Sequence, residues 1–308
     1  MKKIILDCDP GHDDTLAMLL AYAHPRTNLL AVTTVGGNQT LDKVTQNARK
    51  VMTLAGIHDV ILAAGADRPL IKEIEPSEQI HGVTGLDGYD FPEPTVEVDR
   101  RHAVDLIIDL CHQHDKITLI PTAPLTNIGM AIRKDPKILS KIEEIVLMGG
   151  GNARGNREPL AEFNIWQDPE AADIVFRSGL PVTMVGLNLT HQAKATPDVV
   201  RRMQALNNEV ARMAVGLIEF FRSTYAKHFR FDAPPIHDAC AVARVIEPEI
   251  VQCEFVNVEV ELNGTYTYGA TVCDMDGVTG RKPNANVATV LNQETFWDLM
   301  IEALASYK

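Results

Sequence analysis

A cluster of aspartates near the N-terminus constrains this chain more than any other feature. A short apolar run over residues 2–6 predicts a buried strand, and an apolar pattern over residues 15–22 predicts a helix. Four aspartates lie between them, divided by a Pro-Gly turn: Asp7, Asp9, Asp13 and Asp14. Helix capping would account for one or two of these carboxylates, but four like charges are costly together unless a cation neutralises them. The cluster therefore predicts a metal site at a strand-to-helix junction.

The chain after this cluster alternates between short apolar strands and helices. The predicted strands cover residues 28–35, 60–64, 117–120, 144–148 and 180–185. Helical patterns lie between most of them, and such alternation with short loops indicates parallel βαβ units. We predict one α/β domain over residues 1–308, with a Rossmann-like open, mostly parallel sheet flanked by helices. Ligands of such sheets bind at the C-terminal ends of the strands, where the aspartates lie.

The C-terminal part departs from this alternation. Residues 255–262 and 265–272 alternate in polarity and meet at Asn263-Gly264, which predicts a two-residue hairpin turn. A strand at residues 287–291 and a helix at residues 293–307 close the chain. We therefore expect a small C-terminal β-hairpin added to the sheet.

Several polar residues allow two interpretations from the sequence alone. Asn38 follows a strand and is either a turn residue or a site residue. His81 lies in a long irregular loop, which favours a solvated histidine. Tyr225 belongs to an aromatic stripe that is typical of a core. His237-Asp238 opens a helix, either as a cap or as a ligand and acid pair.

Composition excludes some classes of partner. The 29 basic and 41 acidic residues give a net charge of −12, which disfavours nucleic acid and anionic membranes as partners. Five cysteines without a Cys-x-x-Cys pair indicate reduced thiols and a cytoplasmic location. Because Asp7 interrupts the first apolar run, we expect no signal peptide, and no apolar stretch is long enough to span a bilayer.

Oxygen ligands without a histidine or cysteine cluster favour Ca²⁺ or Mg²⁺ over zinc. A carboxylate beside a metal-activated water is a common arrangement for hydrolysis. The residues themselves therefore indicate a divalent-metal hydrolase that acts on a polar, hydroxylated substrate.

The sequence also resembles the nucleoside hydrolases, the inosine-uridine-preferring N-ribohydrolase family, over essentially its whole length. The motifs that carry the resemblance are, in order, Asp7-Cys8-Asp9-Pro10-Gly11-His12-Asp13-Asp14, Gly37-Asn38, His81-Gly82, Gly85-Leu86, Pro124-Leu125-Thr126-Asn127, Met148-Gly149-Gly150, Glu162-Phe163-Asn164 and His237-Asp238-Ala239. The resemblance implies calcium-dependent hydrolysis of ribonucleosides to ribose and free base for nucleoside salvage. It leans towards the bacterial pyrimidine-preferring enzymes, with inosine also possible as a substrate, and it implies a homotetramer.

The resemblance also implies roles for single residues. Asp9, Asp14, Asp238 and the Thr122 carbonyl would hold Ca²⁺, and Asp9 would be the general base for the attacking water. His237 would protonate the leaving base. The remaining residues would contact the substrate: Asp13 and Asn164 at the ribose hydroxyls with Asn38 near them, Asn156 and Glu162 at the 5′-hydroxyl, and Met148 at the sugar. His81 and His237 would face the base, over which the segment near Tyr225 would close. Asp7 would lie just behind the cluster.

Two other functions fit parts of the sequence. In a haloacid-dehalogenase-like phosphatase, Asp7 would be the nucleophile and Asp9 the acid, but Gly11 stands where that family usually has Thr or Val. A non-catalytic nucleoside-binding protein with a structural calcium is the other alternative.

Overall fold

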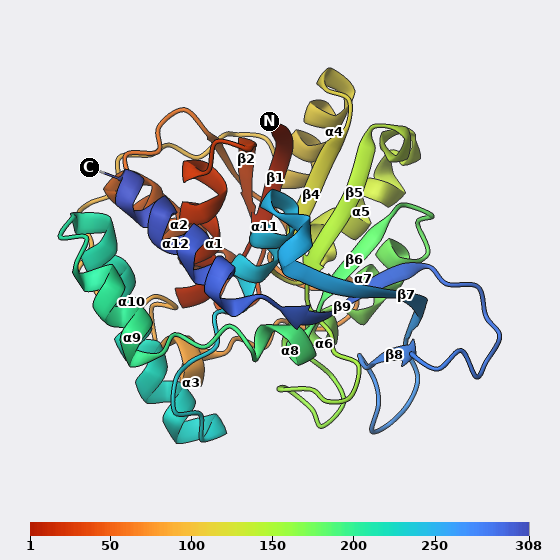
Figure 1. The fold of residues 1–308 in the computed structure, drawn as a ribbon. Coiled ribbons are helices and arrows are strands. Elements are labelled where there is room, and N and C mark those ends of the chain that lie inside the picture. The colour runs from red at the N-terminus through yellow and green to blue at the C-terminus, as the bar shows by residue number, and fades with distance from the viewer. Residues whose placement is uncertain (308) are drawn as a thin grey trace.

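The structure is a computed structural model that describes residues 1–307. Its strands form one sheet in the order β3-β2-β1-β4-β5-β6-β9-β7-β8 (Figure 1). The strands are β1 (Lys2–Cys8), β2 (Thr27–Thr34), β3 (Ile61–Ala64), β4 (Ile117–Pro121), β5 (Ile142–Met148), β6 (Val182–Val185), β7 (Val251–Val260), β8 (Thr271–Asp274) and β9 (Ala285–Leu291). Pairing is parallel from β3 to β9, and β7 is antiparallel to both β9 and β8. The predicted open, mostly parallel sheet is confirmed.

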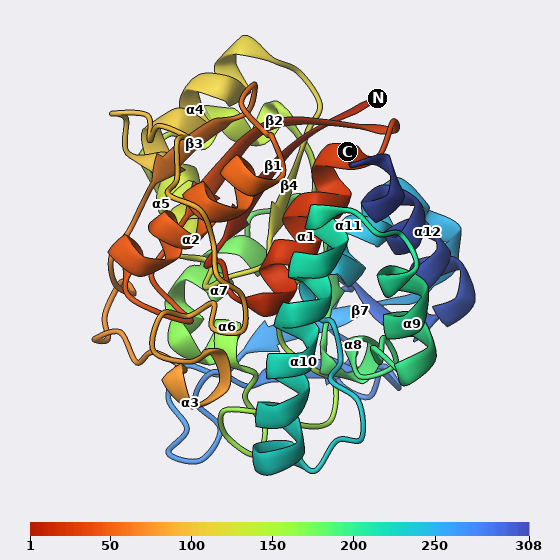
Figure 2. The ribbon, with the colours of Figure 1, turned by 90° about the vertical axis from the view of Figure 1, so that its left-hand side faces the viewer.

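Helices cover both faces of this sheet (Figures 1 and 2). They are α1 (His12–Ala23), α2 (Leu41–Leu54), α3 (Glu78–His81), α4 (Ala103–Gln113), α5 (Thr126–Lys134), α6 (Phe163–Gln167), α7 (Pro169–Phe176), α8 (Leu187–Thr190), α9 (Pro197–Gln204), α10 (Glu209–Phe229), α11 (Asp238–Ile246) and α12 (Gln293–Ser306), with 3₁₀ turns at Pro136–Ser140 and Pro248–Ile250. Alternate residues of β1 serve two cores: Ile4 and Leu6 pack with α1, α10, α11 and α12, and Ile5 packs with α4, α5 and α7.

The strand order determines where a ligand site forms. From β1 the chain goes first to β2 on one side of it and later to β4 on the other, so the topology reverses between β1 and β4. A crevice opens at such a point beyond the C-terminal ends of the strands. Asp9 directly follows β1 and Thr122 directly follows β4. Two of the predicted metal ligands are therefore neighbours at this edge of the sheet.

The start of α1 directs the aspartates inward. Gly11 is the N-cap, and the Asp14 carboxylate accepts hydrogen bonds from the backbone N–H groups of Gly11 and Asp9, at 3.1 and 3.3 Å. A Cβ atom on Gly11 would lie 2.5 Å from Nδ1 of His81, so only glycine permits this close approach. Capping of α1 thus places acidic side chains in the first turn, where the helix dipole favours negative charge.

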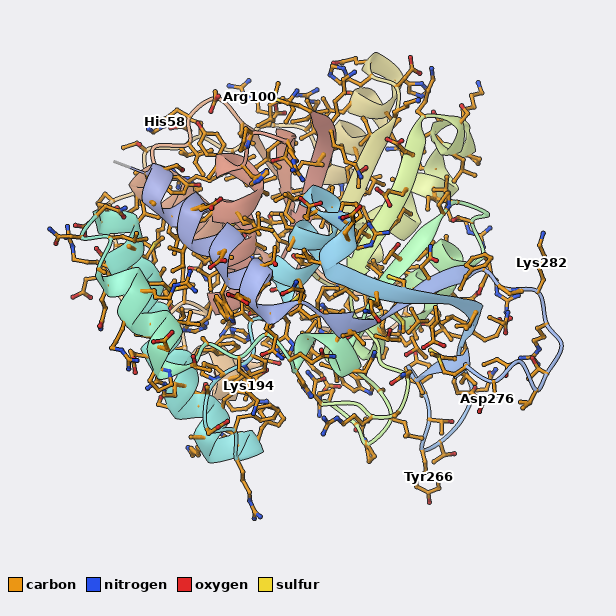
Figure 3. The ribbon with its side chains drawn as sticks, viewed as in Figure 1. His58, Arg100, Lys194, Tyr266, Asp276 and Lys282 are labelled. Atoms are coloured by element: carbon orange, nitrogen blue, oxygen red, sulfur yellow. The ribbon has the colours of Figure 1, made fainter. Side chains whose placement is uncertain are left out.

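The predicted hairpin is present, but its turn is not the expected one. β7 and β8 are antiparallel neighbours, whereas residues 261–270 form the connection in place of a two-residue turn at Asn263-Gly264. The Glu261 carboxylate accepts hydrogen bonds from the N–H groups of Asn263 and Gly264, at 2.8 and 3.1 Å, which holds them in a wider loop. Tyr266 projects outward from this loop and is 87% exposed (Figure 3). β7 is also a full member of the main sheet rather than an addition to it.

Among the described residues, no helix combines the length and the apolarity that a membrane crossing requires.

Candidate active site

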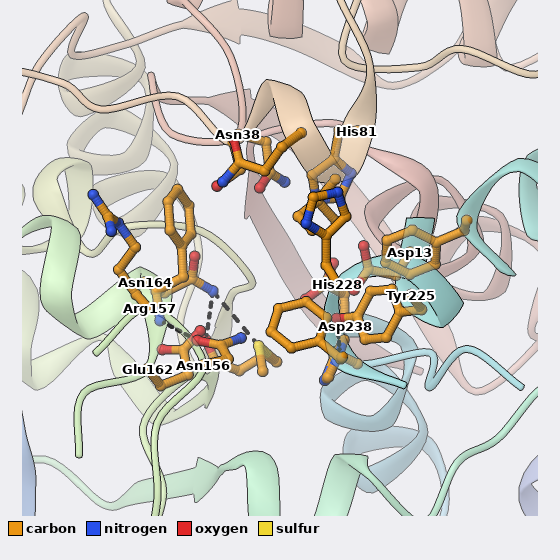
Figure 4. Close-up of a pocket in the computed structure, with 18 of the residues that line it drawn as sticks. Asp13, Asn38, His81, Asn156, Arg157, Glu162, Asn164, Tyr225, His228 and Asp238 are labelled. Carbon is orange, nitrogen blue, oxygen red and sulfur yellow. Dashed lines mark hydrogen bonds between the residues drawn. The ribbon is translucent and has the colours of Figure 1, made fainter. Parts of the chain in front are cut away.

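A cavity of about 230 Å³ lies beyond the C-terminal ends of β1 and β4 (Figure 4). Eleven of the residues proposed from the sequence line it: Asp13, Asn38, His81, Thr122, Met148, Asn156, Glu162, Asn164, Tyr225, His237 and Asp238. The other two, Asp9 and Asp14, are fully buried beside it. The structure therefore brings together residues from distant parts of the chain around one small cavity.

Buried carboxylates form the floor of the cavity. Oxygen atoms of Asp13, Asp14 and Asp238 lie within 4.8 Å of one another, an arrangement compatible with a metal site. Asp9 is not a member of this set; its Oδ2 accepts a hydrogen bond from the backbone N–H of Asn38 at 2.6 Å. Its Oδ1 is buried and has no hydrogen-bond partner among the described residues. A buried oxygen of this kind next to three carboxylates is what an oxygen-coordinated cation would satisfy.

The chain is shaped closely around the Asp9 side chain. A Cβ atom on Gly37 would lie 2.1 Å from Oδ2 of Asp9, so the loop after β2 can cover this carboxylate only with a glycine there. Asn38 donates through Nδ2 to the Asp9 carbonyl and to Oδ2 of Asp14, both at 3.2 Å. Asn38 therefore supports the two aspartates, in addition to lining the cavity.

The protein alone does not compensate the charge of the cluster. Burial, followed by repulsion from Asp14, raises the pKa of Asp13 to about 7 and the pKa of Asp9 well above its usual value. The pKa of Asp238 is raised well above its usual value by burial and then by Asp13 and Asp14. Such shifts mark sites where a bound cation or a proton must supply the missing positive charge.

Asp7 lies behind the cluster and does not line the cavity. It is fully buried, and its Oδ1 accepts hydrogen bonds from Thr33 at 2.6 Å and from Asn127 at 2.8 Å. These contacts tie Asp7 to β2 and α5, behind the cluster.

Amide and carbonyl groups form one wall. Nδ2 of Asn164 donates to the carbonyls of Thr122 and Met148, at 3.0 and 3.1 Å. These bonds occupy the amide nitrogen and leave the Asn164 Oδ1 atom without a hydrogen-bond partner among the described residues. The Thr122 hydroxyl donates to Oδ1 of Asp14 at 3.0 Å, which links this wall to the floor. Asn156, Glu162 and Asn164 lie together on this side of the cavity in Figure 4.

Glu162 is the most buried acidic group of this wall. It is the N-cap of α6, and its Oε2 accepts hydrogen bonds from the N–H groups of Gly150 and Ile165, at 2.9 and 3.2 Å. Burial nevertheless raises the pKa of Glu162 from 4.5 to about 7. Asn156 accepts a hydrogen bond from the N–H of Phe163 at 2.9 Å, so both predicted 5′-hydroxyl contacts are fixed by the start of α6.

This raised pKa predicts a pH-dependent stability effect of Glu162→Gln. A raised folded-state pKa gives a stability contribution that is present below pH 4.5 and is lost as the pH rises through about 7. Gln cannot ionise, so the variant should exceed the wild type in free energy of unfolding by up to roughly 3 kcal/mol at pH 8 and match it at pH 4. Urea unfolding at both pH values measures this difference. An equal difference at the two pH values would contradict the assignment.

Helix α10 supplies an aromatic wall opposite the amides. Phe221, Tyr225, His228 and Phe229 line the cavity from this helix. The Tyr225 hydroxyl lies 2.7 Å from Nε2 of His237, whose Nδ1 lies 2.7 Å from the Thr190 hydroxyl. Both ring nitrogens of His237 are therefore engaged by hydroxyl groups.

The environment of His237 differs from the sequence-based expectation. The resemblance implies that His237 protonates the leaving base, but burial, followed by repulsion from His191, lowers the pKa of His237 well below 6.5. The residue is 4% exposed and starts α11 at the base of the cavity. In the free protein His237 is neutral, so any proton it delivers must be held by the pair that it forms with Tyr225.

Sequence reasoning missed several lining residues. Arg157, Phe163 and Phe221 line the cavity and were not proposed. Arg157 stacks on Trp166 with its Cζ 4.2 Å from the ring centre and pairs with Glu75 at 2.6 Å, so contacts distant in sequence place it. The pattern offered no signal for Arg157, whereas Phe221 belongs to the aromatic stripe that was interpreted as core. His81, expected to be solvated from its loop position, is instead 6% exposed and lines the cavity.

Comparisons with known proteins agree with this geometry. Residues 4–298 match the family described as "Inosine-uridine preferring nucleoside hydrolase". The chain is 48% identical to the inosine-uridine preferring nucleoside hydrolase of Crithidia fasciculata, over 98% of this chain and 97% of that protein. It is 44% identical to the pyrimidine-specific ribonucleoside hydrolase RihA of Shewanella sp. (strain MR-7), over 99% and 97%.

A solved structure gives the same result for the fold. The purine-preferring ribonucleoside hydrolase from Gardnerella vaginalis superimposes with a TM-score of 0.92 at 33% identity, covering 99% of this chain and 98% of that one. Sequence and fold thus agree along nearly the whole chain. The chain belongs to the inosine-uridine preferring nucleoside hydrolase family.

Proposed function

We propose that this protein hydrolyses the N-glycosidic bond of ribonucleosides, releasing ribose and the free base. Its family is one of hydrolases, and relatives at 44–48% identity are named as inosine-uridine preferring or pyrimidine-specific enzymes. The observation that carries the proposal is one small cavity with buried carboxylates at its floor and an aromatic wall facing them. Carboxylates suit the ribose, which gains positive charge in the transition state, and the aromatic wall suits a base.

We further propose that the floor holds Ca²⁺. The donors are all hard oxygens, and the unpartnered Oδ1 of Asp9 together with the close carboxylates of Asp14 and Asp238 fits such an ion. The Thr122 carbonyl would be a further ligand. When bound, a divalent cation lowers the pKa of a water molecule and neutralises the surrounding carboxylates.

Within this site Asp9 acts as the general base. Its Oδ2 is held by the Asn38 N–H, and its Oδ1 has no partner among the described residues, so one oxygen is oriented and the other is available to accept a proton. Asp13 and the free Oδ1 of Asn164 accept hydrogen bonds from the ribose hydroxyls. Glu162 and Asn156 contact the 5′-hydroxyl, and Met148 packs against the sugar ring.

The leaving base is protonated on the opposite side. His237 and the Tyr225 hydroxyl form a pair 2.7 Å apart, and Tyr225 lines the cavity on the aromatic wall. In this step His237 first takes up a proton to become the imidazolium, then gives that proton to the base, directly or through the Tyr225 hydroxyl, and returns to the neutral imidazole. Because the negative charge of the departing base is neutralised, the pair lowers the barrier for bases that are poor leaving groups.

The phosphatase alternative conflicts with the position of Asp7. That function needs Asp7 as the nucleophile, but the Oδ1 of Asp7 accepts hydrogen bonds from Thr33 of β2 and Asn127 of α5, behind the cluster. An acidic floor also repels a phosphate group.

The five cysteines are all free thiols, and on this ground we propose a reducing compartment such as the cytoplasm.

Ribose release from a nucleoside panel tests the function. We expect turnover of uridine, cytidine or inosine but not of 2′-deoxyuridine, and complete loss of activity after chelation that added Ca²⁺ restores. The assay is reducing-sugar formation with each nucleoside, with and without chelator. Phosphate release from a phosphomonoester without any ribose release would replace this proposal with the phosphatase, and binding without turnover would replace it with a nucleoside-binding protein.

A further inference from the structure

Two buried histidines meet at the edge of the cavity. Nδ1 of His12, in the first turn of α1, lies 3.1 Å from Nδ1 of His81, at the end of α3. Nε2 of His12 lies 2.8 Å from the Asp87 carbonyl oxygen. The His12 ring also stacks on Phe220 and on Phe221, with ring centres 5.1 Å away in each case. These contacts fix the orientation of the His12 ring.

The positions of the hydrogen atoms follow from these contacts. A carbonyl oxygen only accepts hydrogen bonds, so Nε2 of His12 carries a hydrogen. In a neutral His12 the other nitrogen, Nδ1, is then an acceptor. The hydrogen between the two Nδ1 atoms must therefore belong to His81. A neutral His81 with its hydrogen on Nδ1 has a lone pair on Nε2.

Both rings are in surroundings that favour the neutral form. His12 is 1% exposed and His81 is 6% exposed, and Phe221 contacts both rings. Within the described chain, no carboxylate lies at ion-pair distance from either imidazole. A buried cation without a counter-charge is costly, whereas the neutral pair satisfies both of its Nδ1 atoms with one hydrogen bond.

The remaining nitrogen of His81 is directed to the substrate. His81 lines the cavity (Figure 4), and its Nε2 makes no hydrogen bond to the residues that the structure describes. The ring lies 5.4 Å from Phe221, so it belongs to the aromatic side, where the base would bind. A hydrogen-bond acceptor at this position, Nε2 of His81, favours substrates whose base carries an N–H donor.

We propose that His12 is a positioning residue that holds His81 in the Nδ1–H tautomer, so that Nε2 of His81 accepts a hydrogen bond from an N–H group of the nucleobase. This inference rests on the proposed ribonucleoside hydrolysis. The substrates it favours are nucleosides whose base offers an N–H donor, such as the imide of uridine or the amine of cytidine. Because the contact already forms in the bound substrate, its loss raises KM more than it lowers kcat.

The tautomer itself is tested by NMR of the wild-type protein labelled with ¹⁵N in its histidines. Two-bond ¹H–¹⁵N correlations distinguish a protonated ring nitrogen from one with a lone pair, and the spectrum of His81→Gln assigns the His81 signals. We expect Nδ1 of His81 to carry the hydrogen. A hydrogen on Nε2 would overturn the proposal, and this result needs neither catalytic activity nor a folded His12 variant.

Kinetics of a matched pair of variants test the role of His12. In His12→Gln the amide can still accept from Nδ1 of His81 and donate to the Asp87 carbonyl, whereas His12→Leu can do neither. The probe is the ratio of kcat/KM for uridine to that for 3-methyluridine, which lacks the N–H. We expect a ratio of about tenfold or more in the wild type and in His12→Gln, and a several-fold smaller ratio in His12→Leu, mainly through KM for uridine.

The outcomes separate this inference from the function on which it rests. An unchanged ratio in a folded His12→Leu variant, or a ratio in His12→Gln as low as that in His12→Leu, would refute the role of His12. If the wild type hydrolyses no ribonucleoside at all, the proposed function fails, and the NMR measurement still decides which tautomer His81 adopts.

Discussion

Asp9→Asn is expected to lower kcat for uridine by at least about 10³-fold while leaving the fold intact. The substitution keeps the shape of a fully buried side chain and an oxygen that can accept the hydrogen bond from the Asn38 N–H. It removes the basic Oδ1 atom, which has no other partner among the described residues, and one charge of the proposed calcium site. Steady-state kinetics with saturating Ca²⁺ measure the loss, and circular dichroism checks the fold.

Asp7→Asn is the matched control for this variant. It makes the same chemical change two residues earlier, at a fully buried aspartate that contacts Thr33 and Asn127 and does not line the cavity. We expect Asp7→Asn to retain activity within about tenfold, because it removes neither the base nor a group that touches substrate. Near-normal turnover in Asp9→Asn, or equal losses in the two variants, would remove Asp9 from the role of base.

The fold was predictable because its signals are local. In β1 the apolar run fills both cores, with Ile4 on one face and Ile5 on the other, and the turn after it leads at once into α1. The break between α9 and α10 lies at Asn207-Asn208, where Asn208 caps α10 by accepting from the Ala211 N–H at 2.8 Å. These features depend on neighbouring residues, so sequence patterns report them directly.

The hairpin turn shows where local signals fail. Asn-Gly favours a tight two-residue turn. In the structure, however, the backbone N–H groups of Asn263 and Gly264 donate to the carboxylate of Glu261, and this stabilises a longer loop. The loop is also fixed at its far end, because the Tyr268 hydroxyl donates to Glu170 at 2.7 Å and Gly269 packs on Trp166. These contacts come from distant parts of the chain, so the turn propensity of Asn-Gly cannot predict them.

The residues of the site also fall into two groups, those that local sequence patterns predicted and those that only the folded structure reveals. The aspartate cluster was evident because its members lie within one short stretch of sequence, and Asp238 was noticed because it begins a helix. Arg157 enters the cavity through its stacking on Trp166, and His12 meets His81 from a different helix, so neither role was evident from spacing. Shifted pKa values are still less accessible, since burial by the assembled fold is their first cause.

His237→Ala is expected to slow uridine hydrolysis by about 10²-fold or more, but to slow hydrolysis of p-nitrophenyl riboside by less than about tenfold. Uracil is a poor leaving group that needs a proton, whereas p-nitrophenolate leaves without one. His237 is neutral in the free protein because burial lowers its pKa, so the proton must be stabilised by the pair with Tyr225. Rates with both substrates in the same variant measure this selectivity.

Tyr225→Phe separates a relay from direct transfer. It removes the hydroxyl that lies 2.7 Å from Nε2 of His237 and keeps the aromatic wall. If the proton passes through that hydroxyl, Tyr225→Phe reproduces the selective loss of His237→Ala, and the double variant is no slower than either single one. If His237 acts directly, Tyr225→Phe has a much smaller effect on uridine. Equal losses on both substrates in His237→Ala would assign His237 to substrate binding instead of proton transfer.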